Sequence, residues 1–270
     1  MTVEDVVNWL DQSFPPVLAE EWDNTGLLLG SSARPVESIL TCLTLTSDVA
    51  AEAVQLGAGL VVTHHPLMFR PLQRITSCTS EGRLLLQLLE AGVAVYSPHT
   101  AFDSAACGIN QQLAEMFGLL EIAPLRPAIG AAAEAAVTAA GTSGSGRQGL
   151  LPEPCCLAEL VEQVKRLLPC GVVQWVGDGT LPVSRLAVAC GSAAEYLTDA
   201  ERNGCQVLLT GEARFHAALA ARDAEMGLIL AGHYATERPA VEQLAAMIGT
   251  AFPALRVQPS QQETDPLKWS

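Results

Sequence analysis

The sequence predicts an α/β fold, with duplicated βαβ units that form mostly parallel sheets flanked by helices. Short apolar runs alternate with amphipathic segments along most of the chain, which is typical of parallel sheets. Two stretches of the chain also resemble each other at a constant spacing, which indicates a duplicated unit. Of the 270 residues, 49% are hydrophobic and 16% are charged, enough for a compact core.

The first half alternates helices and strands, and glycines mark where helices end. Val3, Val6, Val7 and Leu10 share one face of an N-terminal helix. In chain order we expect a helix at Met1–Leu10, a strand at Ile39–Leu45, a helix capped by Ser47 or Asp48 that ends at Leu56 before Gly57, a strand at Leu60–Thr63, a helix at Arg83–Ala91 stopped by Gly92, a strand at Val93–Tyr96, and a helix at Asn110–Phe117 closed by Gly118.

The middle of the chain breaks this rhythm. Residues 127–154 hold an Ala-rich stretch, the glycines Gly141, Gly144 and Gly146, and then Pro152 and Pro154. This composition predicts a loop or an irregular edge strand. The glycines do not form a phosphate-binding loop, because they neither follow a predicted strand nor open a helix with Lys and Ser or Thr.

The alternation resumes in the second half. We expect a helix at Cys156–Leu168, a strand at Val172–Val176, a strand at Leu186–Cys190, a helix at Glu195–Asn203, a strand at Val207–Thr210, a helix at Arg214–Glu225, a strand at Leu228–Ala231 and a helix at Pro239–Ile248. The chain therefore divides into a first α/β half (1–126), a connecting segment without a large inserted domain (127–182) and a second α/β half (183–270).

The two halves align with each other. Ala53–His65 matches Ala200–Glu212 at an offset of 147 (200 minus 53), including the turn glycine and the apolar strand. Each half later has a His-x-x-x-acid pattern after a strand, at His99–Asp103 and at His233–Glu237. A duplicated βαβ unit explains this pattern better than chance.

Composition excludes several classes of function. The net charge is −14, from 15 Lys and Arg against 29 Asp and Glu, which disfavours binding to nucleic acid or anionic membranes. No apolar run reaches the 18 residues of a membrane span, and the acidic N-terminus lacks the positive charge of a targeting peptide. The eight cysteines form no C-x-x-C pair and indicate free thiols in a cytoplasmic protein, with a stray disulfide or a thiol ligand as the alternatives.

Candidate ligands cluster after the predicted strands, at the edge where open α/β sheets bind ligands. They are His64, His65, Asp103, His233 and Glu237. Imidazoles and carboxylates suit zinc, iron, manganese or nickel. Five such groups exceed the needs of one four-coordinate ion, and a carboxylate can bridge two ions. We therefore expect two divalent ions per chain, with the two halves arranged around a dimetal site.

Simpler interpretations exist for these residues. A His-His doublet is often accidental, and His-x-x-x-Glu is often a pair on a helix surface. Pro239 places His233–Glu237 in the loop before a helix, which weakens the second interpretation. Glu212 also follows a strand, and His216 one turn later is either near the metals or faces solvent. No G-x-S-x-G motif supports a side-chain nucleophile.

These residues resemble the Nif-three-like family, the YbgI-type dinuclear metal centre proteins labelled type-2 GTP cyclohydrolase I homologues. The matching motifs cover nearly the whole chain and are EWDNTGL (Glu21–Leu27), THHPL (Thr63–Leu67), YSPHTAFD (Tyr96–Asp103), LTGE (Leu209–Glu212) and GHYATER (Gly232–Arg238). The resemblance implies that the five candidates are the metal ligands, with Glu237 as the bridge. It also implies a toroidal hexamer, and a position near the site for Trp22, Asp23 and Asn24.

The chemistry and the resemblance favour a metal-dependent hydrolase that acts through a metal-activated water, with a nucleotide as a candidate substrate. His99 or His216 would carry the proton. The alternative is a non-catalytic hexameric scaffold that stores or delivers metal or serves as an adaptor. The two differ in whether bound metal is accompanied by turnover.

Overall fold

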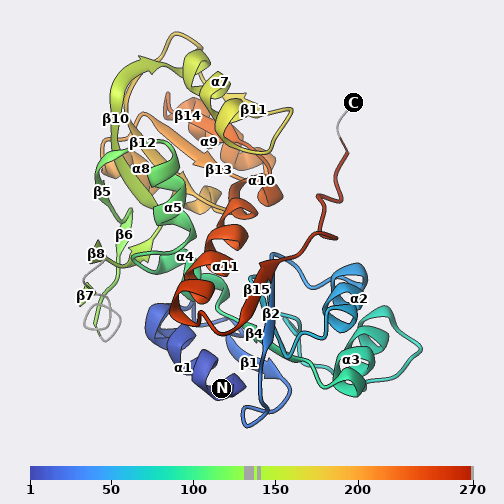
Figure 1. The fold of residues 1–270 in the computed structure, drawn as a ribbon. Helices are drawn as coiled ribbons and strands as arrows, with labels where there is room; N and C mark the ends of the chain where they lie inside the picture. Colours follow the sequence, from blue (N-terminus) through green and yellow to red (C-terminus); the bar gives the residue numbers. More distant parts are fainter. Residues whose placement is uncertain (131–136, 139–140, 269–270) are drawn as a thin grey trace. The chain divides into compact units, whose positions relative to one another are not determined.

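The computed structural model describes residues 1–130, 137–138 and 141–268, and the chain forms two compact units (Figure 1). Unit 1 comprises Met1–Phe102 and Ala240–Pro266, and unit 2 comprises Asp103–Pro239 with the end of the chain. This division differs from the three consecutive regions expected from the sequence (1–126, 127–182 and 183–270). The chain leaves unit 1 after Phe102 and returns to it at Ala240.

Unit 1 contains a five-stranded sheet in the order β1-β4-β3-β2-β15. Its strands are β1 (Gly26–Leu29), β2 (Ser38–Cys42), β3 (Leu60–Thr63), β4 (Ala94–Ser97) and β15 (Arg256–Pro259). Strands β15, β2, β3 and β4 run parallel, and β1 pairs antiparallel with β4 at one edge. The strand predicted at Leu60–Thr63 is confirmed residue for residue, whereas β1 and β15 were not expected.

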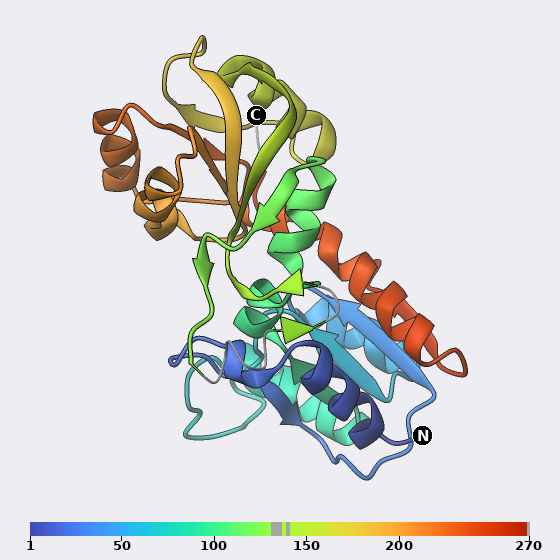
Figure 2. The ribbon, with the colours of Figure 1, turned by 90° about the vertical axis from the view of Figure 1, so that its left-hand side faces the viewer.

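Helices cover both faces of this sheet (Figures 1 and 2). They are α1 (Val3–Ser13), followed by the short 3-10 helix η1 (Pro16–Leu18), α2 (Ser47–Gln55), α3 (Ser80–Ala91) and α11 (Pro239–Ala251). Leu40 and Val61 pack into a buried cluster with side chains of α2 and α3. Successive strand residues point to opposite faces, and Thr41 accordingly donates a hydrogen bond to Val241 of α11 (3.1 Å).

Helix ends in unit 1 follow local capping chemistry. Thr2 and Asp5 form a capping box at the start of α1. Thr46 caps α2 by accepting from the Val49 N–H, so the cap expected at Ser47 or Asp48 lies one or two residues earlier. Gly92 ends α3 as predicted, with a left-handed φ of 68° that glycine adopts without steric cost.

Unit 2 contains a six-stranded sheet in the order β11-β14-β13-β12-β10-β5. Its strands are β5 (Leu120–Ala123), β10 (Arg147–Cys156), β11 (Gln174–Val176), β12 (Pro182–Ala189), β13 (Val207–Thr210) and β14 (Gly227–Leu230). The central three strands, β12 to β14, run parallel, and antiparallel strands extend the sheet on both sides. The α/β fold class is confirmed, and the parallel part of this sheet is its centre.

The helices of unit 2 connect these strands. They are α5 (Ile109–Met116), α7 (Leu157–Leu167), the 3-10 helix η2 (Ala194–Tyr196), α8 (Leu197–Arg202), α9 (Phe215–Asp223) and α10 (His233–Glu237). Helix α4 (His99–Ser104) spans the passage from unit 1 to unit 2. Two small antiparallel sheets pair β6 (Arg126–Pro127) with β9 (Gly144–Ser145) and β7 (Val137–Thr138) with β8 (Gly141–Thr142).

The loop or irregular edge strand expected at residues 127–154 is wrong for residues 147–154, which belong to β10. β10 is a ten-residue strand that pairs with both β12 and β5, so it is not an edge strand. Its pairing with β12 shifts between Leu150 and Cys155, where Pro152 and Pro154 lie. A bulge tolerates proline because no ladder hydrogen bond is needed from its nitrogen. Most of the Ala-rich stretch lies outside the described residues.

The duplication is visible in the register of the two sheets. Ile39 of β2 pairs with Leu60 of β3, and Leu186 of β12 pairs with Val207 of β13. Equivalent residues of the two pairs are therefore 147 positions apart (186 minus 39, and 207 minus 60), which is the offset found in the sequence alignment. The order β2-α2-β3-α3-β4-α4 corresponds to β12-α8-β13-α9-β14-α10. Equivalent strand ends in the two units therefore carry the candidate residues.

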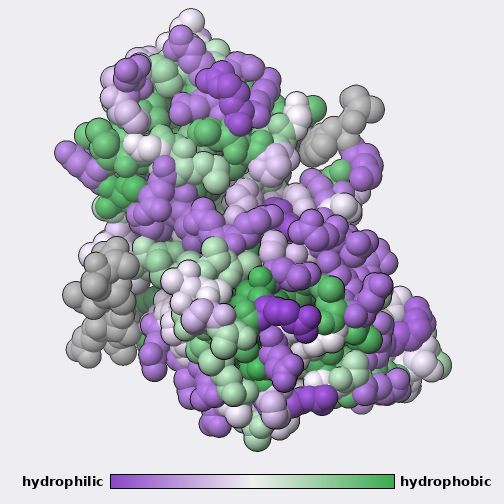
Figure 3. Space-filling model, viewed as in Figure 1, coloured by the Kyte–Doolittle hydropathy of each residue, from purple (hydrophilic) through white to green (hydrophobic). Residues whose placement is uncertain are grey.

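Polar side chains cover most of the face shown in Figure 3, with apolar side chains exposed between them. Within the described part of the chain, every helix is too short or too polar to serve as a membrane-spanning segment.

Candidate metal site

His64 and His65 continue directly from β3, and their backbone is fixed from both sides. Their N–H groups donate to the carbonyls of Cys42 (3.0 Å) and Leu43 (2.8 Å). The Ser97 hydroxyl at the end of β4 donates to the carbonyl of His64 (2.6 Å). His64 is buried, with 1% of its surface exposed. The strand end therefore sets the position of both imidazoles.

His99 joins these two histidines within unit 1. Its ring centroid lies 5.1 Å from that of His64 and 5.8 Å from that of His65, and the His64 and His65 centroids are 5.0 Å apart. One ligand nitrogen from each ring lies within 4.8 Å of the other two. Three imidazoles at this spacing fit a divalent metal ion. The sequence analysis expected His99 to carry a proton, and the structure also places it among the possible ligands.

Asp23 orients the His99 ring. A carboxylate oxygen of Asp23 lies 2.7 Å from His99 Nδ1, and Thr100 donates to the other oxygen through its N–H (3.1 Å) and its hydroxyl. Burial alone would raise the pKa of Asp23, but the hydrogen bonds from His99 and Thr100 and the His99 charge hold it at about 2. An ionised Asp23 only accepts, so Nδ1 of His99 carries the hydrogen and Nε2 is left to accept a proton or bind a metal.

The backbone at His99 takes an unusual conformation. Its φ is +32°, in the region that non-glycine residues rarely adopt. Such strain persists where surrounding contacts fix the residue, and it is concentrated at functional sites. Here the hydrogen bonds of Asp23 to His99 and Thr100 supply those contacts. Of the other residues predicted near the site, Trp22 has its ring 6.0 Å from that of His99, and Asn24 donates to the carbonyl of Met68 (2.6 Å).

In unit 2, His233 and Glu237 form the helical turn α10, so the loop expected there is wrong. The helix places His233 Nε2 3.1 Å from a Glu237 carboxylate oxygen, and His233 Nδ1 3.1 Å from Glu212. Glu237 is only 3% exposed, so this is not an ordinary surface pair. The hydrogen bond to Glu237 raises the pKa of His233 to about 9, against the effect of burial and with further help from Glu212.

Two glycines make room for these side chains, and sequence reasoning did not single them out. A Cβ on Gly191 would lie 2.3 Å from a Glu237 carboxylate oxygen and 3.3 Å from His233 Nε2. A Cβ on Gly211 would lie 2.8 Å from His233 Cα. Both glycines follow the strands β12 and β13, and this strand-end position was the available signal. The backbone approaches the Glu237 carboxylate closely because no side chain intervenes.

Asp103 lies beside a buried cysteine that the sequence analysis assigned no role. The Cys190 thiol donates to the Asp103 carboxylate (3.3 Å), and Asn110 links the two backbones by donating to the Asp103 carbonyl (3.1 Å) and accepting from the Cys190 N–H (2.8 Å). Burial, followed by the charges of Asp103 and Glu237, raises the pKa of Cys190 well above its ordinary value. Cys190 is therefore a neutral thiol that orients Asp103.

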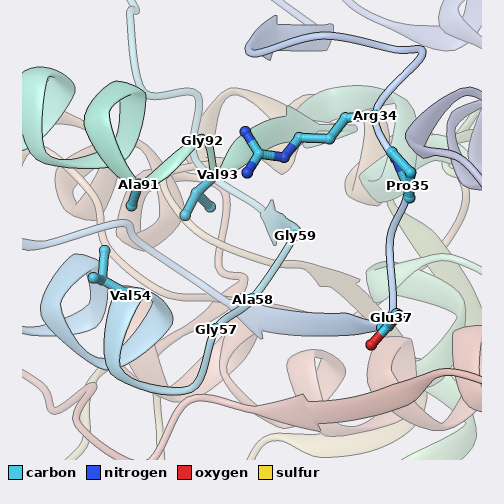
Figure 4. A pocket seen from close by; sticks show the side chains of 10 residues that line it. All are labelled: Arg34, Pro35, Glu37, Val54, Gly57, Ala58, Gly59, Ala91, Gly92 and Val93. Atoms are coloured by element: carbon cyan, nitrogen blue, oxygen red, sulfur yellow. The ribbon is translucent and has the colours of Figure 1, made fainter.

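His216 lies apart from these contacts. It is exposed in the first turn of α9, with its ring 6.2 Å from that of Phe215. Unit 1 also has a pocket of about 320 Å³ at the opposite, amino-terminal ends of its parallel strands (Figure 4). There the Arg34 side chain extends over Gly92, among aliphatic walls such as Val54 and Val93. This pocket contains no histidine and is separate from the imidazole cluster.

Comparison with known proteins agrees with the motifs. The family model Duf34/NIF3 (NGG1p interacting factor 3) matches residues 1–266. A "GTP cyclohydrolase 1 type 2 homolog" of Clostridium acetobutylicum is 29% identical over 273 residues, covering 100% of this chain and 99% of that protein. The "Protein NIF3 homolog" of Schizosaccharomyces pombe is 34% identical over 85% of this chain and 82% of its own.

Solved structures share the fold. A Bacillus cereus protein related to NIF3 superposes with a TM-score of 0.90 at 24% identity, over 100% of this chain and 99% of that one. The protein ybgI, described as of unknown function, gives a TM-score of 0.82 at 24% identity, over 96% and 98% of the two chains. With the family model spanning nearly every residue, this chain belongs to the Duf34/NIF3 family.

Proposed function

We propose that this protein is a metal-dependent hydrolase that binds two divalent ions per chain and acts on a nucleotide. The proposed ligands are His64 and His65 of unit 1 and Asp103, His233 and Glu237 of unit 2. The observation that carries the proposal is the imidazole cluster at the end of β3, with ligand nitrogens within 4.8 Å of one another. The nucleotide is suggested by the cyclohydrolase name of the Clostridium acetobutylicum relative.

The donor set of each unit fits a divalent ion. Unit 1 offers the imidazoles of His64 and His65, whose backbone is fixed at the end of β3. Unit 2 offers the His233 imidazole and the buried Glu237 carboxylate, packed against the backbone of Gly191. Imidazole with carboxylate suits zinc, iron, manganese and nickel.

The chain's own residues supply proton transfer. A bound divalent ion lowers the pKa of a coordinated water and polarises the bond to be hydrolysed. Asp23 keeps the hydrogen of His99 on Nδ1, which leaves Nε2 to take a proton from the attacking water and return it to the leaving group. His216 is the second proposed proton carrier, and its exposed position in α9 makes it accessible to substrate.

Turnover and metal content of the same preparations test this proposal. We expect protein reconstituted with zinc, manganese, iron or nickel to hydrolyse GTP or a related nucleotide. His65→Ala should remove both the activity and one ion, because His65 is a ligand with no other proposed task. Unchanged activity in His65→Ala would contradict the assignment.

A second candidate, a non-catalytic metal-binding scaffold or adaptor, is favoured by the family description, which names an interacting factor. It predicts that the protein binds a stoichiometric amount of metal, keeps this metal when nucleotides are added, and turns over none of them. A panel of nucleotides and esters assayed with the reconstituted protein separates the two functions.

The proposed assembly is a homo-oligomer, a toroidal hexamer, and the proposed location is the cytoplasm. The eight cysteines, all among the described residues, are thiols in the structure, which suits a reducing compartment. Light scattering should give a mass six times that of the chain. A monomeric mass at micromolar concentration would contradict the hexamer.

A further inference from the structure

Two large aromatic side chains are exposed beside the imidazole cluster of unit 1. Trp22 is 60% exposed and Phe69 is 53% exposed, yet their rings contact each other at 5.8 Å with an interplanar angle of 62°. Each also contacts the His99 ring nearly edge-on, Trp22 at 6.0 Å and 76° and Phe69 at 6.4 Å and 88°. We call Trp22 and Phe69 the aromatic corner.

Polar contacts hold the aromatic corner in place. Asn24 donates through its side chain to the carbonyl of Met68 (2.6 Å), which ties the segment of Trp22 to the segment of Phe69. Asp23, next to Trp22, is fixed by His99 and Thr100. The two rings therefore form one contiguous apolar surface beside polar side chains, an arrangement that is typical of ligand-binding sites.

The segment that carries Phe69 is positive in an otherwise acidic protein. Residues 66–80 contain Arg70 and Arg74 and no Asp or Glu, whereas the whole chain has a net charge of −14. Both arginines are exposed, and neither takes part in a hydrogen bond or ion pair among the described residues. Arg83, by contrast, braces the segment by donating to the Ser77 carbonyl (3.0 Å).

We propose that the aromatic corner stacks the planar heteroaromatic ring of a nucleotide and that Arg70 and Arg74 contact its phosphates. Aromatic faces bind any base by stacking, and guanidinium groups bind phosphate through paired hydrogen bonds. The ring would lie beside His99, so this inference rests on the proposed function and names the groups that recognise the substrate.

The test measures binding and turnover separately. Calorimetry with GTP, guanosine and inorganic triphosphate is carried out on the full-length protein as purified, and on its His65→Ala variant so that binding is measured without hydrolysis. Trp22→Leu and Phe69→Leu are compared with Trp175→Leu and Phe215→Leu, which remove exposed rings from unit 2 (41% and 73% exposed). Arg70→Gln/Arg74→Gln is compared with Arg222→Gln.

Trp22→Leu and Phe69→Leu should each weaken the binding of GTP and of guanosine about 5- to 150-fold, which is the range for the loss of one base-stacking contact. The binding of triphosphate should be unaffected. The Arg70→Gln/Arg74→Gln variant should bind GTP and triphosphate more weakly than the wild type does, and should bind guanosine with unchanged affinity. The control variants should bind as the wild type does.

Equal binding of GTP to wild type, Trp22→Leu and Phe69→Leu would overturn the proposal, even if turnover is found. A change of oligomeric state in these variants with unchanged GTP binding would also overturn it and assign the rings to a subunit contact. Weakened binding without turnover in the wild type would support the aromatic corner and contradict the hydrolase.

Discussion

At the residue scale, one carboxylate sets the protonation of one imidazole. Asp23 is held ionised, with a pKa of about 2, by the hydrogen bonds and charge that outweigh its burial. Because an ionised carboxylate can only accept, it fixes the hydrogen of the neutral His99 ring on Nδ1. The same hydrogen bonds hold the backbone of His99 at its unusual φ of +32°. Asp23 thus defines the tautomer through which His99 would carry a proton in the proposed reaction.

Asp23→Asn should lower kcat about 100-fold or more, because an amide can donate to Nδ1 and stabilise the wrong tautomer. Metal content should stay at the wild-type level. Asp178→Asn removes an exposed carboxylate that binds Thr180 in unit 2 and is the matched control. Equal kcat and equal pH profiles for Asp23→Asn and wild type would contradict the role of Asp23.

His233 should release a proton when metal binds. Its hydrogen bond to Glu237 raises its pKa to about 9, so the metal-free protein carries a charged His233 at pH 7.5. A ligand imidazole must be neutral, so binding displaces that proton. Titration of metal in two buffers of different ionisation enthalpy should give different observed heats. Identical heats would show that His233 is neutral or is not a ligand.

The same pKa gives the metal-free protein a pH-dependent stability. Because the pKa of His233 is raised above its ordinary value near 6.5, the protonated ring stabilises the folded state at pH values below 6.5. This stabilisation is lost as the pH rises to about 9. In the presence of a chelator, the midpoint temperature of thermal unfolding of the wild type should therefore fall between pH 6.5 and pH 9. The fall should be smaller in His233→Ala. An equal fall in both proteins would contradict the assignment to His233.

At the element scale, the close approach of a strand end to α10 positions Glu237. Gly191, just beyond β12, leaves space for the carboxylate, and its N–H donates to Thr236 in the same turn (3.1 Å). α10 in turn brings His233 and Glu237 to one side, four residues apart. The approach of Gly191 to α10 therefore positions the Glu237 carboxylate of the proposed ligand set.

Gly191→Ala should weaken metal binding about 10-fold or more, because its Cβ would lie 2.3 Å from the Glu237 carboxylate oxygen. Gly204→Ala is the matched control, since φ is 65° at Gly191 and 73° at Gly204 but no atom lies within 4 Å of a Cβ at Gly204. Both variants share the backbone strain, and only Gly191→Ala should lose metal. Equal metal affinity in the two variants would contradict the role of Gly191.

Arg147 joins three segments of unit 2 and should be important for stability. It is fully buried and donates to the carbonyls of Gly144 (2.6 Å), Gly146 (2.7 Å) and Ala105 (2.8 Å), and to Gln111 (2.8 Å). Arg147→Met leaves these acceptors buried and unsatisfied, which should cost about 3 kcal/mol of unfolding free energy. Urea denaturation measures the loss, with the exposed Arg222→Met as control. Equal stability of the two variants would contradict this assignment.

At the scale of the whole molecule, sequence patterns predicted the repeated core. The strands β3 and β13 were predicted exactly, because each is a continuous apolar run bounded by turn signals. The repeat offset reappears in the strand registers, and His64 and His65 lie at the expected strand end. For β3 and β13, whose residues are all buried, the local pattern was sufficient to give the bounds.

The remainder depends on contacts distant in sequence. β10 was missed because Pro152 and Pro154 indicate a break, and only pairing with β12 places them at a bulge. β15 joins the sheet of unit 1 from the far end of the chain, which no local pattern shows. Cys190 and Gly191 contact Asp103 and Glu237, and their position after a predicted strand was the one signal in the sequence, which does not show these neighbours.

Metal content per chain tests the central claim most directly. Elemental analysis of the purified protein should find close to two divalent ions per chain in the wild type. A His64→Ala/Glu237→Ala variant, altered in both units, should lose them while remaining folded by circular dichroism. Absence of stoichiometric metal in the wild type, even after anaerobic reconstitution, would show that the strand-end histidines are structural and would contradict the hydrolase with them.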